Sequence, residues 1–208
     1  MSNAFYALYA DKGEKICFDN APKAYISTYI WGDKYTPVSY AQIVFREDDG
    51  FYVRMYCEEQ NPRATYTKFD DPVYLDSCLE FFCDYLPEKF DGHYINTEMN
   101  ANGAFLTYWA HGIGQYDMIT EMSSSLSTVT PFKDESGWGV LLYVPLTMLR
   151  DIYKGADWTL GSVIRGNFYK CGSDCEIPHY GVWKKINLPH PNFHQPDFFG
   201  EIEIKRAE

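Results

Sequence analysis

Three side chains recur at steps of two along one short stretch of the chain. Tyr94, Asn96 and Glu98 share one face if that stretch is a β-strand, because successive side chains on a strand point to opposite faces. An amide and a carboxylate beside a phenol supply paired donors and acceptors, which suit a ligand rich in hydroxyl groups. A polar strand face also arises from simple contact with solvent. The pattern therefore indicates either a hydroxyl-binding face or a solvated one.

Trp183 is the aromatic residue that best suits a binding role. It stands in a stretch rich in Pro, His and Gly between Cys171 and Phe198, outside any alternating strand pattern. We expect this stretch to be a long ordered loop, and such loops in compact domains are often functional. A flat ring suits the C–H faces of a sugar. Equally, a tryptophan here would pack as a plug at one end of the core.

Arginine and asparagine side chains offer further hydrogen-bond donors to the same kind of ligand. Arg165 and Asn167 alternate onto one face of an expected strand, and Arg63 follows Asn61 and Pro62. Their simpler roles are a surface ion pair and a turn contact.

Acidic residues near one apolar strand pattern suggest a second kind of chemistry. Glu80 interrupts the run 79–82, and Asp76 precedes it. A carboxylate that points inward must be paired, so we expect Glu80 to have a partner such as Arg54 or Arg165. The alternative is a glycoside-processing enzyme that uses paired carboxylates. The acidic side chains available for it are Glu80, Glu98, Asp76 and Asp84. The sequence has no nucleophile elbow and no phosphate-binding glycine loop.

Cysteine, histidine and methionine residues keep two metal-based alternatives open. Zinc-type ligands occur as Cys171, Cys175 and His179 at steps of four, followed by His190 and His194. This spacing differs from the usual CxxC knuckle. A haem site would need a Met/His or His/His axial pair. The methionines considered for it are Met55, Met99, Met118 and Met148, and none of them stands in a recognisable haem-binding frame.

Hydrophobic periodicity predicts the elements that would position these residues. A period of two runs through most of the chain, and in segment 51–58 it places Phe51, Val53, Met55 and Cys57 on one face. Segment 38–45 is expected to pair with it as a hairpin across an acidic turn that ends at Gly50. One short helix is expected at 145–153, where Pro145 suits the first turn. Further strands are expected at 78–85, 93–99, 104–109, 139–144, 159–169 and 199–205, with a tight turn at 100–103.

Many short strands and a single helix are typical of an all-β sandwich or barrel. The chain has 208 residues, which suits one such domain over residues 1–208. Residues 1–4 resemble a cloning scar. As it stands the sequence predicts a cytoplasmic protein, and a secreted one if a leader was trimmed.

Composition excludes some partners and favours others. The formal net charge is −11, so phosphate backbones and anionic membrane surfaces would be repelled, and we expect neither nucleic acid nor membrane as a partner. A neutral sugar is not penalised. Aromatic residues make up 18% of the chain, which suits strands and contact surfaces. The spacing of the six cysteines suggests no disulfide framework and mildly favours a reducing compartment.

Three segments in order resemble carbohydrate-binding module family nine, in its single-domain branch. They are residues 58–82, with Asn61-Pro62-Arg63; residues 94–103; and residues 165–200, with Trp183 and Phe193-His194-Gln195-Pro196. The resemblance runs from about residue 20 to the end of the chain. It implies an immunoglobulin-like or jelly-roll-like antiparallel β-sandwich. It also implies a non-catalytic module that binds a neutral sugar or the end of an oligosaccharide, and it allows a structural calcium ion. The wider DOMON-like superfamily includes haem-binding members.

The resemblance also implies which residues contact the sugar. It places a stacking tryptophan at Trp183 and an opposing aromatic between Glu58 and Asp76. Tyr66, Phe69 and Tyr74 stand there, with no tryptophan, and Tyr66 is the preferred candidate because its neighbours are polar. The expected binding residues are Trp183, Tyr66, Tyr94, Asn96, Glu98, Arg63, Arg165, Asn167 and His194.

Overall fold

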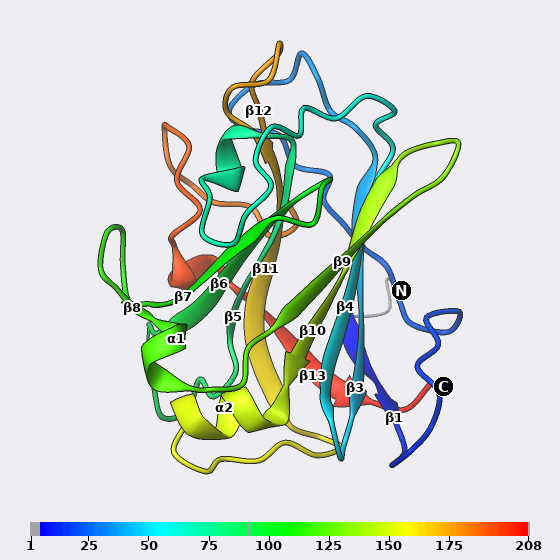
Figure 1. Ribbon diagram of the computed structural model, residues 1–208, viewed down its shortest axis with the longest axis vertical. Coiled ribbons are helices and arrows are strands. Elements are labelled where there is room, and N and C mark those ends of the chain that lie inside the picture. The colour runs from blue at the N-terminus through cyan, green and yellow to red at the C-terminus, as the bar shows by residue number, and fades with distance from the viewer. Residues whose placement is uncertain (1–4, 91, 208) are drawn as a thin grey trace.

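The computed structural model describes residues 5–90 and 92–207, and the chain over these ranges is built mainly of β-strands (Figure 1). The proposed cloning scar at residues 1–4 lies outside them. The strands are β1 Tyr6–Ala10, β2 Ala24–Tyr25, β3 Ser39–Arg46, β4 Gly50–Cys57, β5 Cys78–Asp84, β6 Tyr94–Asn100, β7 Phe105–Ala110, β8 Tyr116–Met118, β9 Thr128–Lys133, β10 Trp138–Pro145, β11 Val163–Gly172, β12 His179–Val182 and β13 Gly200–Lys205.

These strands form one curled sheet whose two halves face each other as a β-sandwich. The order is β8-β7-β6-β5-β11-β13-β1-β3-β4-β10-β9, with β12 paired to β11 and β2 to β3. Strand β13 crosses from one half toward the other beside β1 (Figure 1). Most pairs are antiparallel, as expected for this fold class, but β1 pairs in parallel with both β13 and β3. The sheet is therefore mixed at the edge where the two halves join.

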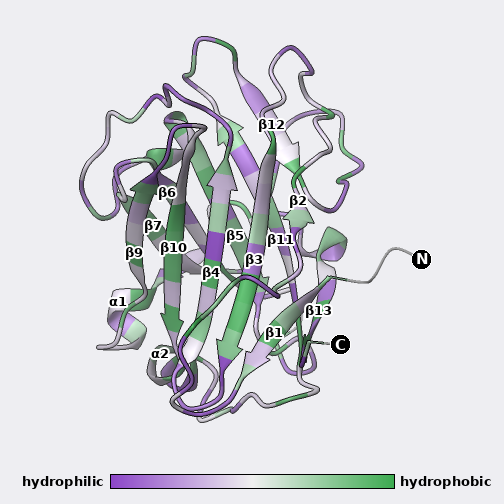
Figure 2. Ribbon diagram, turned by 90° about the vertical axis from the view of Figure 1, so that its right-hand side faces the viewer, coloured by the Kyte–Doolittle hydropathy of each residue, from purple (hydrophilic) through white to green (hydrophobic). Residues whose placement is uncertain are grey.

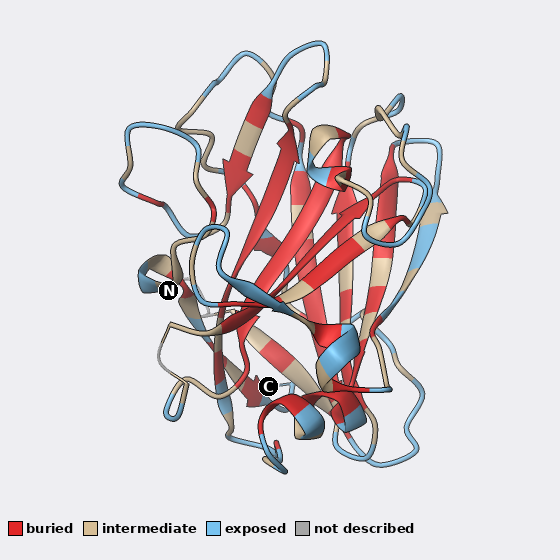
Figure 3. Ribbon diagram, turned by 60° about the vertical axis from the view of Figure 1, so that its left-hand side comes forward, coloured by how far each residue is buried: buried red, intermediate tan, exposed pale blue. Residues whose placement is uncertain are grey.

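The main core lies between the two halves. Figure 2 shows the half formed by β1, β3, β4 and β10, with hydrophobic residues recurring along its strands. Phe51, Val53, Met55 and Cys57 are fully buried there, which confirms the predicted face. Leu79 and Phe81 of β5 enter the same core from the other half. Burial follows the strands and exposure follows the loops (Figure 3), as hydrophobic alternation requires.

A second, smaller core covers the outer face of β5, β6 and β11. It contains Phe82, Tyr94 and Tyr169, on which Phe193 and Phe199 pack from the C-terminal segment. Because of this cover, every residue of β5 and of β6 is buried, including the polar ones on the outer face. This half of the sheet is thus buried on both sides, which places polar side chains out of bulk solvent.

Two expectations about local structure were incomplete. The predicted helix is confirmed as α2, Leu146–Ile152, but a second short helix, α1, spans Ile119–Met122. The stretch 171–198 is not all loop, because the last two residues of β11 and the whole of β12 lie in it. Two short 3-10 helices, η1 (Val73–Leu75) and η2 (Pro196–Phe198), flank the outer face. Over the described residues, no helix has the length and hydrophobicity needed to cross a membrane.

Candidate functional site

A polar row crosses the outer face of the half-sheet at its centre. Glu80 of β5 lies opposite Glu98 of β6, and Phe82 lies opposite Asn96. The neighbouring residues Leu79 and Phe81 point into the main core, so alternation sends Glu80 outward. The apolar neighbours of Glu80 are therefore the reason that it sits beneath the second core and not in the first.

A groove opens onto this row. Its larger chamber has a volume of about 470 Å³ and its smaller chamber about 270 Å³, and the two share Tyr74, Glu98 and His194. The larger chamber is also lined by Glu80, Phe82, Ile113, Cys171, Ser173, Tyr180, His190, Pro191, Asn192 and Phe193. The smaller one is also lined by Asp70, Pro72, Asn96, Leu106, Tyr108, Ala110, Gly112, Gly114 and Tyr116. The combined size suits a small sugar.

Two buried oxygens in the groove have no hydrogen-bond partner among the described residues. They are Oδ1 of Asn96 and Oε2 of Glu98, whose residues are only 3% and 5% exposed. Asn96 Nδ2 donates to the other Glu98 oxygen at 3.1 Å, which fixes both side chains. Leaving a buried acceptor unpaired costs roughly 1–3 kcal/mol. This arrangement is expected where a ligand supplies the missing donors.

Burial also changes the ionisation of the two glutamates. It raises the pKa of Glu98 to about 7. It raises the pKa of Glu80 well above its ordinary value, and the Cys171 thiol and Glu98 carboxylate add to the effect. Burial therefore favours the protonated acid at both positions, and a carboxyl group that keeps its proton can donate a hydrogen bond as well as accept one. The row can both donate to and accept from hydroxyl groups.

Aromatic side chains border the groove. Tyr74 and Tyr116 are each about half exposed, and the rings of Tyr108 and Tyr116 lie 4.4 Å apart. The hydroxyl of Tyr108 donates to Asp70, which anchors that ring. Exposed rings beside buried hydrogen-bonding groups match the two kinds of surface that a sugar presents.

His194 is held in place from below. Its Nδ1 lies 2.7 Å from the hydroxyl of Tyr94, and its ring lies 5.1 Å from that of Phe82. Burial lowers the pKa of His194, so the ring is neutral near pH 7. Tyr94 itself is fully buried, and it therefore supports His194 instead of facing the groove.

The structure brings together some of the predicted site residues and separates others. Asn96, Glu98 and His194 line the groove, with Tyr94 beneath them. Trp183 lies on the opposite face of β11: its backbone N–H donates to Phe168, and its ring packs on Phe168 and Phe5. That position corresponds to the packing role considered for it. Its stacking role stays a prediction, without support from the shape of the groove.

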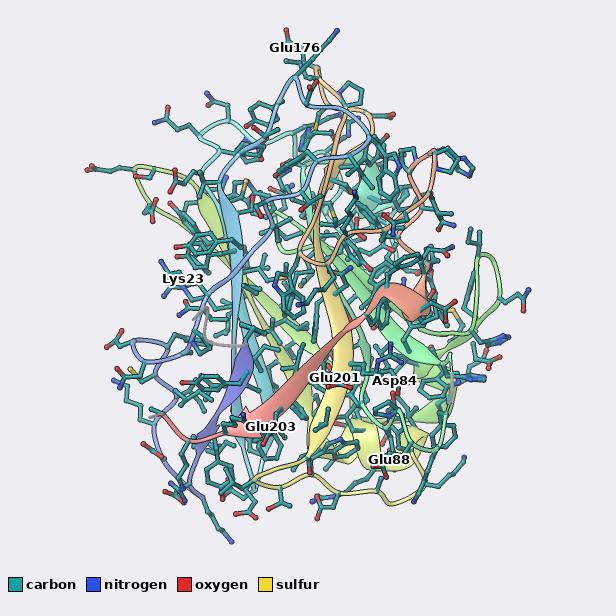
Figure 4. The ribbon with its side chains drawn as sticks, turned by 180° about the vertical axis from the view of Figure 1, so that it is seen from behind. Lys23, Asp84, Glu88, Glu176, Glu201 and Glu203 are labelled. Atoms are coloured by element: carbon teal, nitrogen blue, oxygen red, sulfur yellow. The ribbon has the colours of Figure 1, made fainter. Side chains whose placement is uncertain are left out.

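Asn167 and Arg165 hold the chain together beside the groove. Asn167 Nδ2 donates to the carbonyl of Lys184 at 2.9 Å, and Asn167 Oδ1 accepts the Lys184 N–H at 2.9 Å. Arg165 Nη2 donates to the carbonyl of Phe199. In the sheet register Arg165 of β11 pairs with Asp84 of β5 on one side and with Glu201 of β13 on the other. Figure 4 shows Asp84 and Glu201 side by side on these two flanking strands. Both donors are thus engaged by the fold.

Arg63 and Tyr66 shape the segment that carries Tyr74. Arg63 forms an ion pair with the buried Asp76, whose second oxygen accepts the N–H groups of Thr65 and Tyr66 at 2.8 and 3.0 Å. Tyr66 packs against the second core but does not line the groove. Of the three aromatics considered for the opposing position, Tyr74 is the one that lines both chambers.

The expected arginine partner of Glu80 was wrong. Cys171 Sγ donates to Glu80 Oε1 at 2.8 Å, whereas the Arg54 guanidinium lies over the ring of Phe132. Arg165 is engaged elsewhere, as described above. Glu80 does not need a cation as partner, because burial raises its pKa and so favours the neutral, protonated acid.

The metal-based alternatives also change. Alternation on β11 sends Cys171 to the groove, while Cys175 and His179 line a separate polar chamber, so the zinc-type set is split between two places. Among the described residues, the ligand atoms that converge are those of Cys78, Glu80 and Cys171. For haem, Met55, Met99 and Met148 are buried in the main core and face away from the groove. The structural calcium stays a prediction.

The sequence indicated only part of the groove. Tyr108, Tyr116, Tyr180, Ile113 and Phe193 were not singled out. Phe193 precedes His194, and Tyr108 lies opposite Asn96 in the register, so the alternation of segment 104–109 would have found Tyr108. Tyr116 and Ile113 belong to a loop whose position depends on tertiary packing.

Known proteins resemble this chain in sequence and in fold. The sequence model of carbohydrate-binding family 9 matches residues 11–204. A protein from Bacteroides uniformis with a proposed carbohydrate-binding role has a similar structure, with TM-score 0.73 and 21% identity over 95% of this chain and 99% of that one. No curated protein matches the chain significantly.

Two further similar structures come from one family 9 module of Caldicellulosiruptor kristjanssonii. Its complex with cellotriose has TM-score 0.68 and 13% identity, covering 97% of this chain and 95% of that one. Its complex with glucose gives the same score and identity, with 97% of each chain covered. These likenesses confirm the β-sandwich, while the sequence match extends over nearly the whole chain, so this chain belongs to carbohydrate-binding family 9.

Proposed function

We propose that the groove binds a neutral sugar or the end of an oligosaccharide without catalysis. The observation that carries this proposal is the pair of unpaired oxygens, Asn96 Oδ1 and Glu98 Oε2, on the floor of a concave site. Sugar hydroxyls would donate to both. Membership of a non-catalytic binding family supports the proposal, as do the glucose and cellotriose complexes of the similar module.

The aromatic rim defines the finer proposal. Tyr74 offers a half-exposed ring beside Glu98 in both chambers, and Tyr116 packs against Tyr108 in the lining of the smaller one. The C–H face of a sugar ring would pack on these tyrosines while its hydroxyls reach Asn96 and Glu98. In this proposal Tyr74 and Tyr116 take the stacking role that the family resemblance implies for Trp183 and Tyr66, while Asn96 and Glu98 keep their expected places.

Isothermal titration calorimetry with glucose, cellotriose and a wider glycan panel tests the proposal. At least one glycan should bind, and Asn96→Ala or Glu98→Gln should weaken it by about 10-fold or more, because each removes an acceptor worth roughly 1–3 kcal/mol. Asn167→Ala serves as the control, since Asn167 lies in the same sheet outside the groove. No binding across the panel, or unchanged binding in both groove variants, would refute it.

Glycoside hydrolysis is the second candidate, and one observation favours it. Glu80 and Glu98 are directly opposite each other and both line the larger chamber, and burial raises the pKa of each. A protonated acid beside an ionised carboxylate is the pairing that glycosidases use. Release of a chromophore from aryl glycosides that is lost in Glu98→Gln would establish it, and the absence of turnover with a glycan that binds would eliminate it.

A further inference from the structure

Two cysteines and a glutamate meet at the larger chamber, which Glu80 and Cys171 line and beside which Cys78 is fully buried. Cys171 of β11 lies opposite Cys78 of β5 in the register, and Glu80 follows two residues after Cys78 on the same face. One ligand atom from each lies within 4.8 Å of the other two, and all three residues are buried. The shortest of these contacts is the 2.8 Å hydrogen bond from Cys171 Sγ to Glu80 Oε1.

The donor set selects the class of metal. Two thiolates with one carboxylate match the ligands of Zn²⁺, which binds sulfur at about 2.3 Å and oxygen at about 2.0–2.2 Å. Calcium and magnesium take oxygen ligands, so they do not suit a site with two sulfurs. Small rotations of three side chains that already lie this close would bring them to one ion.

We propose that Cys78, Glu80 and Cys171 bind a thiophilic divalent cation, with Zn²⁺ as the physiological candidate. Glu80 and Cys171 line the larger chamber, so the fourth coordination position faces the groove. Three protein ligands with one open position are typical of zinc sites that take a further ligand from solution. Either water or a hydroxyl group of a bound molecule would complete the tetrahedron.

Neighbouring groups complete the electrostatic argument. Two thiolates and a carboxylate carry three negative charges, which Zn²⁺ reduces to one. The Lys170 ammonium donates to the carbonyl of Cys171 at 3.0 Å, which places a fixed cation beside the site. Cys171 Sγ also lies 3.6 Å from the carbonyl of Tyr74, which orients it. Outer contacts of this kind fix the direction of metal ligands.

Cobalt substitution tests the site directly. The chain, treated with chelator and kept reduced by a phosphine, is titrated with Co²⁺, whose bonds to thiolates give a charge-transfer absorption in the near ultraviolet. We expect saturation at one Co²⁺ per chain and displacement of the band by Zn²⁺. Cys78→Ala and Cys171→Ala should each abolish the band, and Cys83→Ala should retain it, because Cys83 is an equally buried β5 cysteine that faces the main core.

Two outcomes would overturn the proposal. One is no thiolate band in the reduced wild-type chain. The other is a band that survives in Cys78→Ala and Cys171→Ala but disappears in Cys175→Ala, which would place the metal in the separate polar chamber that contains Cys175 and His179. Circular dichroism shows whether each variant is folded.

A measurement on the wild-type chain keeps the test independent of the variants. Zn²⁺ binding should displace the thiol protons and so release at least two protons per ion. Calorimetry in buffers of different ionisation enthalpy measures the number released. Release of fewer than one would contradict thiolate ligation. The same metal-free chain is titrated with the glycan panel. Glycan binding without metal binding refutes only the metal site, and metal binding without glycan binding refutes only the proposed function.

Discussion

Two buried polar clusters lie on opposite faces of the half-sheet that contains β6, β5 and β11, and they differ in whether their hydrogen bonds are complete. On the groove side, Asn96 and Glu98 each retain an unpaired oxygen. On the core side, the Lys170 network consists of Lys170, Ser77, His179 and Glu59. Lys170 Nζ donates to Ser77 Oγ at 2.9 Å and to His179 Nε2 at 2.6 Å, and it lies 3.6 Å from Glu59 Oε2.

Among the described residues, no buried side-chain nitrogen or oxygen of the Lys170 network lacks a hydrogen-bond partner. His179 Nδ1 donates to the carbonyl of Ile177 at 2.8 Å, which leaves Nε2 as the acceptor for Lys170. Glu59 Oε2 accepts from Trp138 Nε1 at 2.9 Å and from the hydroxyl of Ser77. A complete network stabilises the fold, whereas an incomplete one requires something else to complete it. Burial of charge therefore does not mark a binding site; unmet hydrogen bonding does.

Lys170→Met gives the largest expected effect. It removes the ammonium that lies 3.6 Å from Glu59 Oε2 and leaves His179 Nε2 without a donor, so the free energy of unfolding should fall by about 3–5 kcal/mol. Denaturant unfolding measures this. The double variant Lys170→Met/Glu59→Gln should recover a substantial part of the loss, because it removes the uncompensated carboxylate. A loss below about 1 kcal/mol in the single variant would show that the network does not stabilise the fold.

The same network predicts a pH dependence of stability. Burial, together with the Lys170 ammonium, lowers the pKa of His179 to about 4. The unfolded chain therefore binds this proton at higher pH than the folded one, with an ordinary pKa of about 6.5. The stability contributed by neutral His179 is complete above pH 6.5 and is lost as pH falls from there toward 4. The full loss is about 3 kcal/mol.

His179→Gln separates this effect from other acid-labile groups. The glutamine oxygen can accept from Lys170 but does not titrate, so the stability of the variant should vary less between pH 6.5 and 4.5. Burial raises the pKa of Glu59, but the Lys170 ammonium and the hydrogen-bond donors to Glu59 outweigh this effect, so the net pKa is lowered. The stability that ionised Glu59 contributes is therefore lost only below that pH window. Identical pH profiles for the two proteins, measured by thermal or urea unfolding, would remove His179 as the cause.

Glu98→Gln should not destabilise the fold, in contrast to Lys170→Met. It preserves the acceptor that Asn96 Nδ2 uses and removes a buried carboxylate with an unpaired oxygen. We expect the free energy of unfolding to be unchanged or to rise by about 1 kcal/mol while glycan binding weakens by about 10-fold or more, since functional sites commonly sacrifice stability. A fall of more than about 1 kcal/mol, measured by urea unfolding, would indicate that Glu98 is a structural residue like Glu59.

The strands of this fold could be read from the sequence because their alternation is strong. Segment 51–58 was placed correctly, with its buried face, since Phe51, Val53 and Met55 face a continuous core. Strands β1, β2, β8, β9 and β12 were missed because they are short, or lie at an edge, or derive their pairing from distant segments. The parallel pairing of β1 with β3 and β13 depends on such long-range contacts.

The site was harder to predict than the fold. Asn96 and Glu98 follow from alternation, and His194 follows from the family segment. Trp183 is expected in the site because it stands in a stretch rich in Pro, His and Gly where the family resemblance implies a stacking tryptophan, yet its ring lies against Phe5 and Phe168. Which face a loop residue takes is decided by tertiary packing, and periodicity does not report it.

Variants of Tyr74 and Trp183 have the smallest expected effects, and they test directly which of the two rings contacts the sugar. Tyr74→Ala should weaken glycan binding by about 5- to 10-fold, corresponding to about 1 kcal/mol for one stacking ring, without loss of stability because the ring is about half exposed. Trp183→Ala should leave the Kd within about twofold and lower the free energy of unfolding, because it removes an aromatic ring packed on the core. Calorimetry and denaturant unfolding on both variants decide the matter. If Trp183→Ala abolishes binding while Tyr74→Ala does not, the sugar lies on the other face of β11, and the unpaired oxygens of Asn96 and Glu98 must serve a different ligand.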